Sequence, residues 1–558
     1  MKKRFLMIMC MLVAGIMLNA QPSKRTNIWY FGSQVGLDFS SGSPVALTNG
    51  KLGSYEGCGV MSDESGNLLF YTNGNVIWDS NHDTMPNGSG LTSTSSASQT
   101  GLCIPHPGDT DLYYVFTTGH QESVIPAERN LFYSIVDMSL NGGLGDVISG
   151  QKNQVLLSDA VEKVTGVLHD NCNDIWVISH NNGTSDYYAY LISDTGLNTT
   201  PVISSVGTTF PPAGDAGYLK VSHDGSVLVN AMEYSTYVEM YDFDNATGAI
   251  SNPYKITGMT DAYGIEFSMD MTRLYISTTR ETDLFQFDLT AADIAASKTY
   301  IGSASSGPMI PYQGGALQMG PDGKIYMAAF FADGLDVINN PNGLGAACNF
   351  QNKGVLLGMG KYSQIGLPAF LQHYFYQVDF SIQDTCAFNG TTFTLTSDKN
   401  VSSADWDFGD GQSSSDINPT NNYSSTGSFT VELVYEQCGV SDTVEKDITI
   451  VDCGPAPVEL VFLEAVRKEA NIIINWSTAS ETNNDYFLIE RSGDGKDFYT
   501  IGSLKGNGNK NDFSTYQFRD ENPIYGYNYY RLKQVDYDGS FSYSKTVHIE
   551  SGNSSAGI

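Results

Sequence analysis

The sequence of 558 residues is poor in cationic side chains and in cysteine. Lysine and arginine number 29 against 61 aspartate and glutamate residues, which gives a formal net charge of −32 at pH 7. An acidic surface of this kind repels phosphate backbones, so we expect no nucleic-acid partner. The 8 cysteines are scattered and contain no C-x-x-C pair, which argues against a structural zinc site and against a disulfide scaffold.

Long apolar runs are absent beyond the N-terminus. The single run, Phe5–Leu18, follows the basic segment Lys2–Arg4 and precedes Asn19–Ala20, an order typical of a secretory signal peptide. The run is also shorter than the ~20 apolar residues of a membrane-spanning helix. We therefore predict that residues 1–20 are removed, that no transmembrane segment remains after cleavage, and that the mature protein is secreted or lies on the outer cell surface.

Catalytic sequence motifs are missing as well. The chain contains no G-x-S-x-G, no P-loop and no dinucleotide fingerprint, and its 8 histidines form no H-E-x-x-H cluster. His169 and His223 fall in predicted turns, where we expect solvent exposure. No residue is assigned a catalytic or metal-binding role and no cofactor is expected, with calcium left open. The sequence thus specifies no reaction, and a binding protein is favoured over an enzyme.

A short motif recurs along the first two thirds of the chain. Each copy has an apolar strand, a polar turn containing Asp or Gly, and a second strand rich in aromatic and β-branched residues, which is typical of a β-hairpin. The turns centre on Asp63, Asp109, Cys172, Asp224, Asp270 and Asp322. Their spacing, about 46 to 63 residues, is close to the ~40–50 residues of a propeller blade. The alternative is a pair of β-sandwiches.

These repeats predict an all-β protein with a seven-bladed β-propeller over residues 21–376, followed by two β-sandwich domains. The seventh blade is expected to begin with the strand that starts at Gly366. The segment Asn27–Ser40 would supply the remaining strands of that blade, because such closure removes exposed sheet edges.

Beyond residue 376 the sequence becomes rich in Ser, Thr and Asn, and it contains one specific string. This string is Trp406-Asp407-Phe408-Gly409-Asp410-Gly411, with Asn418-Pro419 and Gly427–Val431 following. It resembles the polycystic-kidney-disease (PKD) domain, which implies a β-sandwich over residues 377–453. Trp406 and Phe408 are expected to enter its core, and the glycines to form a tight turn. Asp407 and Asp410 are interpreted as turn caps, with calcium binding as the alternative.

Two further expectations concern the cysteines of this region. Cys386 and Cys438 lie in the same predicted domain, and export permits disulfides, so we predict that these two residues pair. An odd number of cysteines remains after signal cleavage, which leaves at least one thiol free. Cys453, in the linker that follows, is the candidate.

Residues 457–550 form the last predicted domain, and residues 551–558 form a short tail. The strands resemble a fibronectin type III-like sandwich of the kind found in secreted Bacteroidetes proteins. Its expected core positions are Trp476, Tyr486, Phe487, Ile489, Tyr530 and Leu532. Glu481 and Arg491 are expected to pair at the surface.

The repeat region is itself similar to a propeller-like module of Bacteroidetes gliding and surface proteins that carry PKD domains. The similarity lies in NIWYFG from Asn27, GNLLFYTNGNVIWD from Gly66, MPNGSGL from Met85 and LNGGLGDV from Leu140. It implies export by the type IX secretion system.

A propeller binds its partners mainly at the mouth of its channel, where the loops leading into the inner strands converge. Seven polar residues occupy these loops: Glu56, Gln99, Glu162, Asp215, Asp261, Gln313 and Gln364. Such a ring suits a carbohydrate, a metal ion or a basic peptide, and ordinary solvated loop residues are the alternative.

From this ring we predict a non-catalytic binding or adhesion protein. Its propeller would bind a glycan, or an extracellular or cell-envelope protein, and its sandwiches would act as spacers. One alternative is an extracellular polysaccharide-degrading glycosidase or lyase that uses the ring carboxylates. The other is a structural component of a motility or adhesion apparatus.

Overall fold

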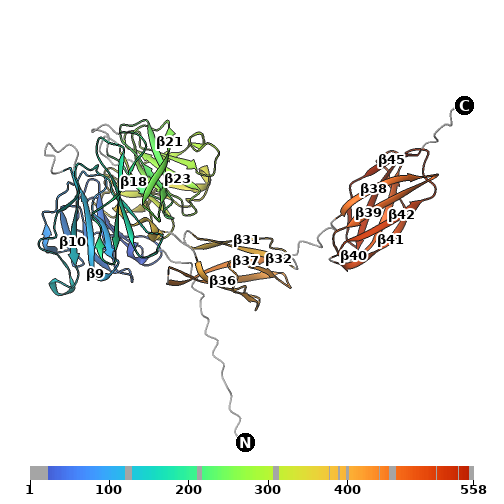
Figure 1. Ribbon diagram of the computed structural model, residues 1–558, viewed down its shortest axis with the longest axis horizontal. Helices are drawn as coiled ribbons and strands as arrows, with labels where there is room; N and C mark the ends of the chain where they lie inside the picture. The colour runs from blue at the N-terminus through green and yellow to red at the C-terminus, as the bar shows by residue number, and fades with distance from the viewer. Residues whose placement is uncertain are drawn as a thin grey trace, which may run out of the picture. The chain divides into compact units, whose positions relative to one another are not determined.

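The computed structural model is all-β, as predicted (Figure 1). It describes residues 23–119, 129–209, 216–305, 313–375, 378–387, 390–397, 401–438, 440–451, 460–510, 512–537 and 539–551. Within these ranges the helical elements are short 3₁₀ turns: η1 (Lys24–Thr26), η3 (Asn141–Gly143), η4 (Ala295–Ser297), η5 (Gly345–Cys348) and η6 (Gln372–Phe375). In the described part of the chain, no helix is both long and apolar enough to span a membrane.

Seven separate sheets precede residue 376 in the described residues. The first sheet has three strands, β1 (Ile28–Phe31), β2 (Val35–Asp38) and β3 (Val45–Leu47). The second has β4 (Cys58–Ser62), β5 (Leu68–Thr72), β6 (Val76–Asp79) and β7 (Thr84–Ser89). The third has β8 (Leu102–His106), β9 (Asp109–Thr118), β10 (Leu131–Asp137), β11 (Asp146–Val147) and β12 (Gln154–Leu157).

The other four sheets follow in chain order. One has β13 (Thr165–Leu168), β14 (Ile175–His180), β15 (Asp186–Ser193), β16 (Gly196–Leu197) and β17 (Val202–Ser205). The next has β18 (Leu219–Val221), β19 (Val227–Asn230), β20 (Tyr237–Asp244) and β21 (Ala249–Thr257). Then come β22 (Ala262–Phe267), β23 (Arg273–Thr278), β24 (Asp283–Asp288) and β25 (Thr299–Ser303). The last has β26 (Gly314–Met319), β27 (Ile325–Ala329), β28 (Gly334–Ile338) and β29 (Phe350–Leu356).

The sheet β1–β3 lies between the last of these sheets and the sheet β4–β7. On one side the ring of Trp29 packs edge-on against Tyr326 of β27, with centroids 5.6 Å apart. On the other side Tyr30 stacks on Tyr71 of β5 at 4.5 Å. The N-terminal sheet therefore joins the first and last repeats, which is the cyclic order of a β-propeller. The number of blades stays a prediction.

The predicted pairing of the strand after Gly366 with the N-terminal segment is wrong. Strand β30 (Pro368–Ala369) pairs in parallel with β4, through Pro368 with Cys58 and Ala369 with Gly59, and not with the N-terminal strands. Glycine makes this close approach feasible, because a Cβ on Gly366 would lie 1.7 Å from the carbonyl oxygen of Glu56. The chain thus returns beside the second sheet.

The PKD region is a two-sheet sandwich. One sheet contains β31 (Asp379–Gln383), β32 (Gly390–Thr396) and β35 (Thr420–Asn422). The other contains β34 (Ser413–Ser414), β33 (Val401–Asp407), β36 (Gly427–Gln437) and β37 (Val440–Ile450). Trp406 and Phe408 are buried, and their rings lie 5.0 Å from Phe380 and 5.1 Å from Phe393, respectively.

The turn after β33 accounts for the rest of the motif. Asp407 accepts a hydrogen bond from the backbone N–H of Gly409 (2.8 Å), and Asp410 accepts one from that of Gln412 (3.0 Å). The amide of Asn421 donates to the second oxygen of Asp410 at 2.9 Å. Both carboxylates therefore hold the turn in place, in the manner of turn caps.

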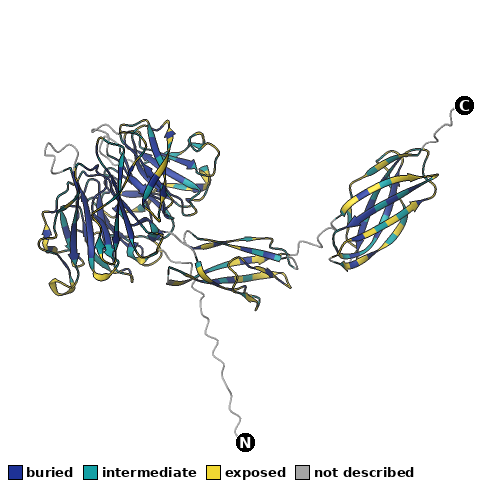
Figure 2. Cartoon of the chain, viewed as in Figure 1, coloured by how far each residue is buried: buried dark blue, intermediate teal, exposed yellow. Residues whose placement is uncertain are grey.

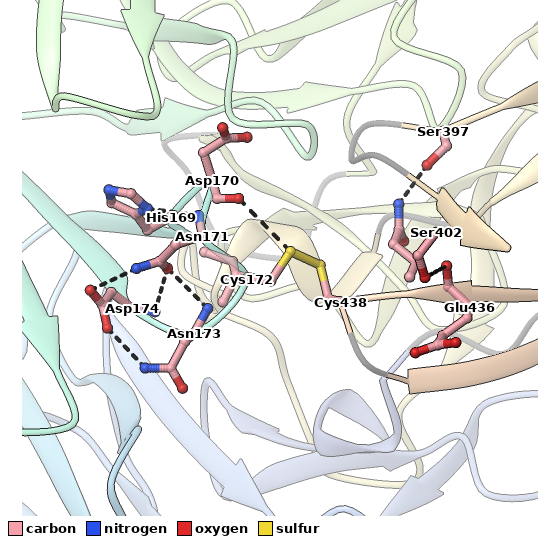
Figure 3. Close-up of a disulfide and its surroundings, with 12 residues drawn as sticks. His169, Asp170, Asn171, Cys172, Asn173, Asp174, Ser397, Ser402, Glu436 and Cys438 are labelled. Carbon is pink, nitrogen blue, oxygen red and sulfur yellow. Dashed lines mark hydrogen bonds between the residues drawn. A yellow bond between two sulfur atoms is a disulfide. The ribbon is translucent and has the colours of Figure 1, made fainter.

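The disulfide predicted between Cys386 and Cys438 is wrong. Cys438, at the β36–β37 turn, is bonded to Cys172 in the β13–β14 turn, as Figure 3 shows. Cys386 lies beside Val451 at the far end of β37, which has 11 residues and is therefore roughly 35 Å long. Cys386 is also disulfide-bonded. Cys453 likewise lies outside the described residues, and Cys58, Cys103 and Cys348 are free and buried.

The last domain is a second two-sheet sandwich. One sheet contains β38 (Leu460–Lys468), β39 (Asn471–Thr478) and β42 (Ser514–Asp520). The other contains β40 (Glu481–Ser492), β41 (Tyr499–Lys510), β43 (Gly526–Asp536), β44 (Phe541–Tyr543) and β45 (Val547–Ser551). The residues buried between the sheets include Trp476, Phe487, Ile489, Tyr530 and Leu532.

Two expectations for this domain fail. Tyr486 is only half-buried, because side chains alternate along a strand and its neighbour Phe487 points into the core. Glu481 does not pair with Arg491: it is fully buried and accepts hydrogen bonds from side chains that include Thr478 and Tyr516. Arg491 forms its ion pair with Asp520, at 2.6 Å.

Candidate functional site

Six of the seven predicted ring residues are described by the structure, on loops that lead into inner strands of the propeller, and several of these six lie close together. Glu56, which precedes β4, is the most connected of them. Its carboxyl group accepts hydrogen bonds from the Tyr263 hydroxyl (2.9 Å) and the Ser96 hydroxyl (3.3 Å). Although it lies on a loop, Glu56 is only 8% exposed. It is therefore part of a built polar site and not a solvated loop residue.

Glu162 and Gln99 are held close to Glu56. Ser98 donates to Glu162 from its backbone N–H (3.1 Å) and from its hydroxyl (3.3 Å), and the same hydroxyl also interacts with Glu56. The Gln99 amide donates to the carbonyl of Leu219 (3.1 Å) and accepts from its N–H (2.7 Å). Gln99 thus fixes the start of β18 and has little capacity left for a ligand, whereas the carboxylates of Glu56 and Glu162 share one hydroxyl.

This proximity changes the protonation of Glu56. Burial, which has the largest effect, and the negative charges of Glu162 and Glu233 together raise its pKa from the usual 4.5 to about 8. At pH 7 the Glu56 carboxyl group is consequently protonated and can donate a hydrogen bond. A neutral Glu56 makes the site less anionic than the ring of carboxylates and amides that the sequence predicted.

Glu233 completes the carboxyl cluster, and it was not among the predicted residues. It lies in the β19–β20 loop, at the same end of the sheets as the loops above, and accepts a hydrogen bond from the Thr279 hydroxyl at 3.0 Å. Burial raises its pKa. The nearby Arg280 guanidinium lies 3.8 Å from Asp261 and 4.7 Å from the ring centre of Tyr234. The sequence prediction considered only the loops that lead into inner strands. Glu233 was missed because it lies in the loop between the second and third strands of its sheet.

Aromatic rings from both sets of loops lie at the same end of the sheets as the carboxyl cluster. The Tyr55 hydroxyl donates to the side-chain oxygen of Gln313, and the Tyr55 ring packs edge-on against Phe330 at 5.4 Å. Phe331 stacks on Tyr362 at 4.3 Å. The Tyr234 side chain is 59% exposed. Hydroxyl, amide and carboxyl groups are therefore combined with half-buried aromatic surface on one face of the propeller.

Three of these loop residues have strained backbones. The φ angles of Tyr234, Asp261 and Phe331 are 67°, 52° and 55°, in the left-handed region that bulky side chains rarely adopt. Such a conformation costs of order 1–3 kcal/mol and persists where the surrounding structure imposes it, often at ligand sites.

The remaining predicted ring residues are less central. The Gln364 amide donates to the Ser33 hydroxyl at 3.0 Å, and its side-chain oxygen is buried without a hydrogen-bond partner. Asp215 lies outside the described residues. Among the residues that the structure does describe, no group of three or more His, Cys, Asp or Glu side chains is arranged to hold a metal ion.

A second polar cluster lies at the β18–β19 turn, at the opposite end of the inner strands. Glu266 is fully buried, 2.8 Å from the Lys220 ammonium and 3.3 Å from His223. Burial disfavours ionisation of Glu266, but Lys220 and His223 outweigh it and keep its pKa below the usual value. The solvent exposure expected for His223 is therefore wrong, since its side chain is wholly enclosed. Lys220 also donates to the carbonyl of Leu317, so the cluster ties together three neighbouring sheets.

Comparisons with known proteins give one family match and a set of distant structural similarities. The family model of the PKD domain matches residues 377–451, which confirms that prediction. The periplasmic gluconolactonase of Pseudomonas aeruginosa is 11% identical, over 67% of this chain and 94% of that chain, with a TM-score of 0.33. The Swd1 β-propeller domain of Myceliophteria thermophila is 9% identical, over 57% of this chain and 94% of that chain, with a TM-score of 0.35. No curated protein sequence matches the chain. At these identities and scores, the similarities assign no activity or ligand to this chain.

Proposed function

We propose that this protein is an extracellular binding protein whose propeller mouth binds a glycan. The observation that carries the proposal is the joining of Glu56, Glu162 and Glu233 with half-buried aromatic rings on one face. A protonated Glu56, the tyrosine hydroxyls and the amides supply both hydrogen-bond donors and acceptors, as sugar hydroxyls require. A basic peptide would favour ionised carboxylates, and the raised pKa of Glu56 opposes that.

The disulfide bonds support a location outside the cytoplasm. Cys172 and Cys438 are joined as a disulfide, and Cys386 is also disulfide-bonded. Disulfides persist in oxidising compartments and are rare in the cytosol. Together with the expected signal peptide, these bonds favour secretion or display at the cell surface, with the two sandwiches acting as spacers.

The test is a binding screen of the full chain against a glycan and polysaccharide panel. We expect at least one glycan to bind, and we expect the Glu56→Gln, Asp261→Asn double variant to lose about tenfold or more in affinity, equivalent to about 1.4 kcal/mol. The matched control is Glu64→Gln, an exposed carboxylate in the β4–β5 turn at the other end of the sheets. Binding that survives in the double variant would reject the mouth as the site.

A second candidate function is polysaccharide cleavage, and the raised pKa of Glu56 next to Glu162 is the observation that favours it. A neutral carboxyl group beside an ionised one is the arrangement that general acid catalysis uses. Release of reducing ends, or of unsaturated products, measured in the same screen separates the two functions. Turnover that Glu56→Gln abolishes would establish an enzyme, whereas binding without release supports the binding protein.

A further inference from the structure

The last sandwich presents a solvent-exposed aromatic surface on its larger sheet. Tyr530 and Leu532 of β43 point into the core, so the alternating residues Tyr529, Arg531 and Lys533 lie on the outer face. We define the aromatic face as Tyr527, Tyr529, Arg531 and Lys533 of β43 with Phe541 and Tyr543 of β44. Tyr527, Phe541 and Tyr543 are 52%, 56% and 47% exposed. Figure 2 shows exposed residues along the strands of this domain.

Arg531 contacts one ring of the aromatic face and one ring beside it. The Arg531 guanidinium lies 4.1 Å from the ring centre of Phe498 and 4.0 Å from that of Tyr543. The same group forms an ion pair with Glu490 across the neighbouring strand, at 2.8 Å. Cation–π contacts and an ion pair together restrict these side chains, which lowers the entropy that binding would cost. The face is thus preorganised.

Lys533 differs from Arg531, because it lacks a carboxylate partner. Its ammonium group lies 3.7 Å from the ring centre of Phe541, and no carboxylate of the described residues lies within 4.0 Å of it. The Lys533 ammonium therefore lies beside an exposed ring with no counterion among the described residues. A negatively charged partner would supply the missing counterion, and exposed apolar patches of this kind mark interaction sites.

We infer that the aromatic face is a second binding site, independent of the propeller mouth, for a polysaccharide that carries carboxylate groups. The apolar C–H faces of its sugar rings pack against Tyr527, Tyr529 and Tyr543, and a sugar carboxylate pairs with Lys533. From Tyr527 to Lys533 the strand extends over roughly 20 Å, long enough for several sugar units. On this account the last sandwich binds a polysaccharide and is more than a spacer between the propeller and the cell.

The experiment measures binding of the full chain to polygalacturonate, a polymer of uronate sugars, with neutral dextran in parallel. We expect binding to polygalacturonate alone, weakening as salt is raised from 50 to 500 mM because exposed charges are screened. Lys533→Met and Tyr527→Ala should each weaken binding about tenfold. Lys468→Met, an exposed lysine on the other sheet, should leave it unchanged, and so should the Glu56→Gln, Asp261→Asn variant of the mouth.

Several outcomes would overturn the inference. They are equal binding to dextran, affinity unchanged in Lys533→Met, or loss of binding only in the mouth variant. Association of the chain with itself, detected by sedimentation and abolished by Tyr527→Ala, would instead assign the face to a second copy. Both substituted side chains lie on the surface, so thermal unfolding curves that match the unsubstituted protein show that the variants are folded.

Discussion

Glu56 makes a specific prediction about pH at the scale of a single residue. Burial raises its pKa from 4.5 to about 8, so between these values the folded state retains a proton that the unfolded state releases. The stability that this group contributes is full below pH 4.5 and is lost as the pH rises through 8. Denaturant unfolding at pH 5 and pH 8 should show the unsubstituted protein losing a few kcal/mol relative to Glu56→Gln. Parallel losses in both proteins would show that Glu56 is ionised throughout.

The buried pair Lys220–Glu266 makes a second prediction at this scale. Lys220→Met should cost about 3–5 kcal/mol in the free energy of unfolding, because it leaves the Glu266 charge uncompensated in the core. The double variant Lys220→Met, Glu266→Leu should recover part of that loss, which a double-mutant cycle measures. The control is Lys353→Met, since its pair with Asp333 is exposed and should contribute about 0–1 kcal/mol. Equal losses in both single variants would contradict this account.

At the scale of elements, the two glycines in the turn of the PKD motif should differ in how well they tolerate substitution. Gly409 and Gly411 both have positive φ, 75° and 88°, but a Cβ on Gly409 would lie 2.4 Å from the carbonyl oxygen of Thr430. A Cβ on Gly411 would meet nothing within 4 Å. Gly409→Ala should therefore destabilise the domain by clearly more than Gly411→Ala, which carries only the backbone strain of about 1 kcal/mol. Chemical denaturation compares the two, and similar losses would mean that the turn relaxes.

Local elements were accessible from the sequence because they depend on neighbouring residues. The alternation of side chains and the Asp–Gly turns predicted the hairpins, and the PKD string predicted the burial of Trp406 and Phe408 and the capped turn. Contacts between distant segments were not accessible. Nothing in the sequence near Gly366 shows that the chain pairs with β4, and nothing near Cys438 points to Cys172.

The candidate site, too, could be predicted from the sequence only where it depends on local features. The spacing of the repeats and the positions of their turns placed Glu56 and Glu162 on loops that converge at the mouth. Glu233 lies on a second set of loops, between the second and third strands, which the repeat motif does not include. The protonation of Glu56 depends on burial and on Glu162, which lies far away in the sequence. Such an effect arises only once the sheets are assembled.

At the scale of the whole molecule, the disulfide between Cys172 and Cys438 joins the propeller and PKD regions covalently. Digestion of the unreduced protein should yield a peptide pair that contains these two residues, identified by mass spectrometry, and the pair should disappear after reduction. Recovery of Cys438 linked to Cys386 would restore the pairing predicted from the sequence and contradict the structure.

The most direct test of the central claim, a glycan site at the propeller mouth, is hydrogen–deuterium exchange with and without a glycan identified in the binding screen. Protection should appear in the loops that carry Glu56, Glu233, Asp261 and Phe331, and it should be absent in the Glu56→Gln, Asp261→Asn variant. Protection confined to the sandwiches, with the mouth loops unchanged, would contradict the account.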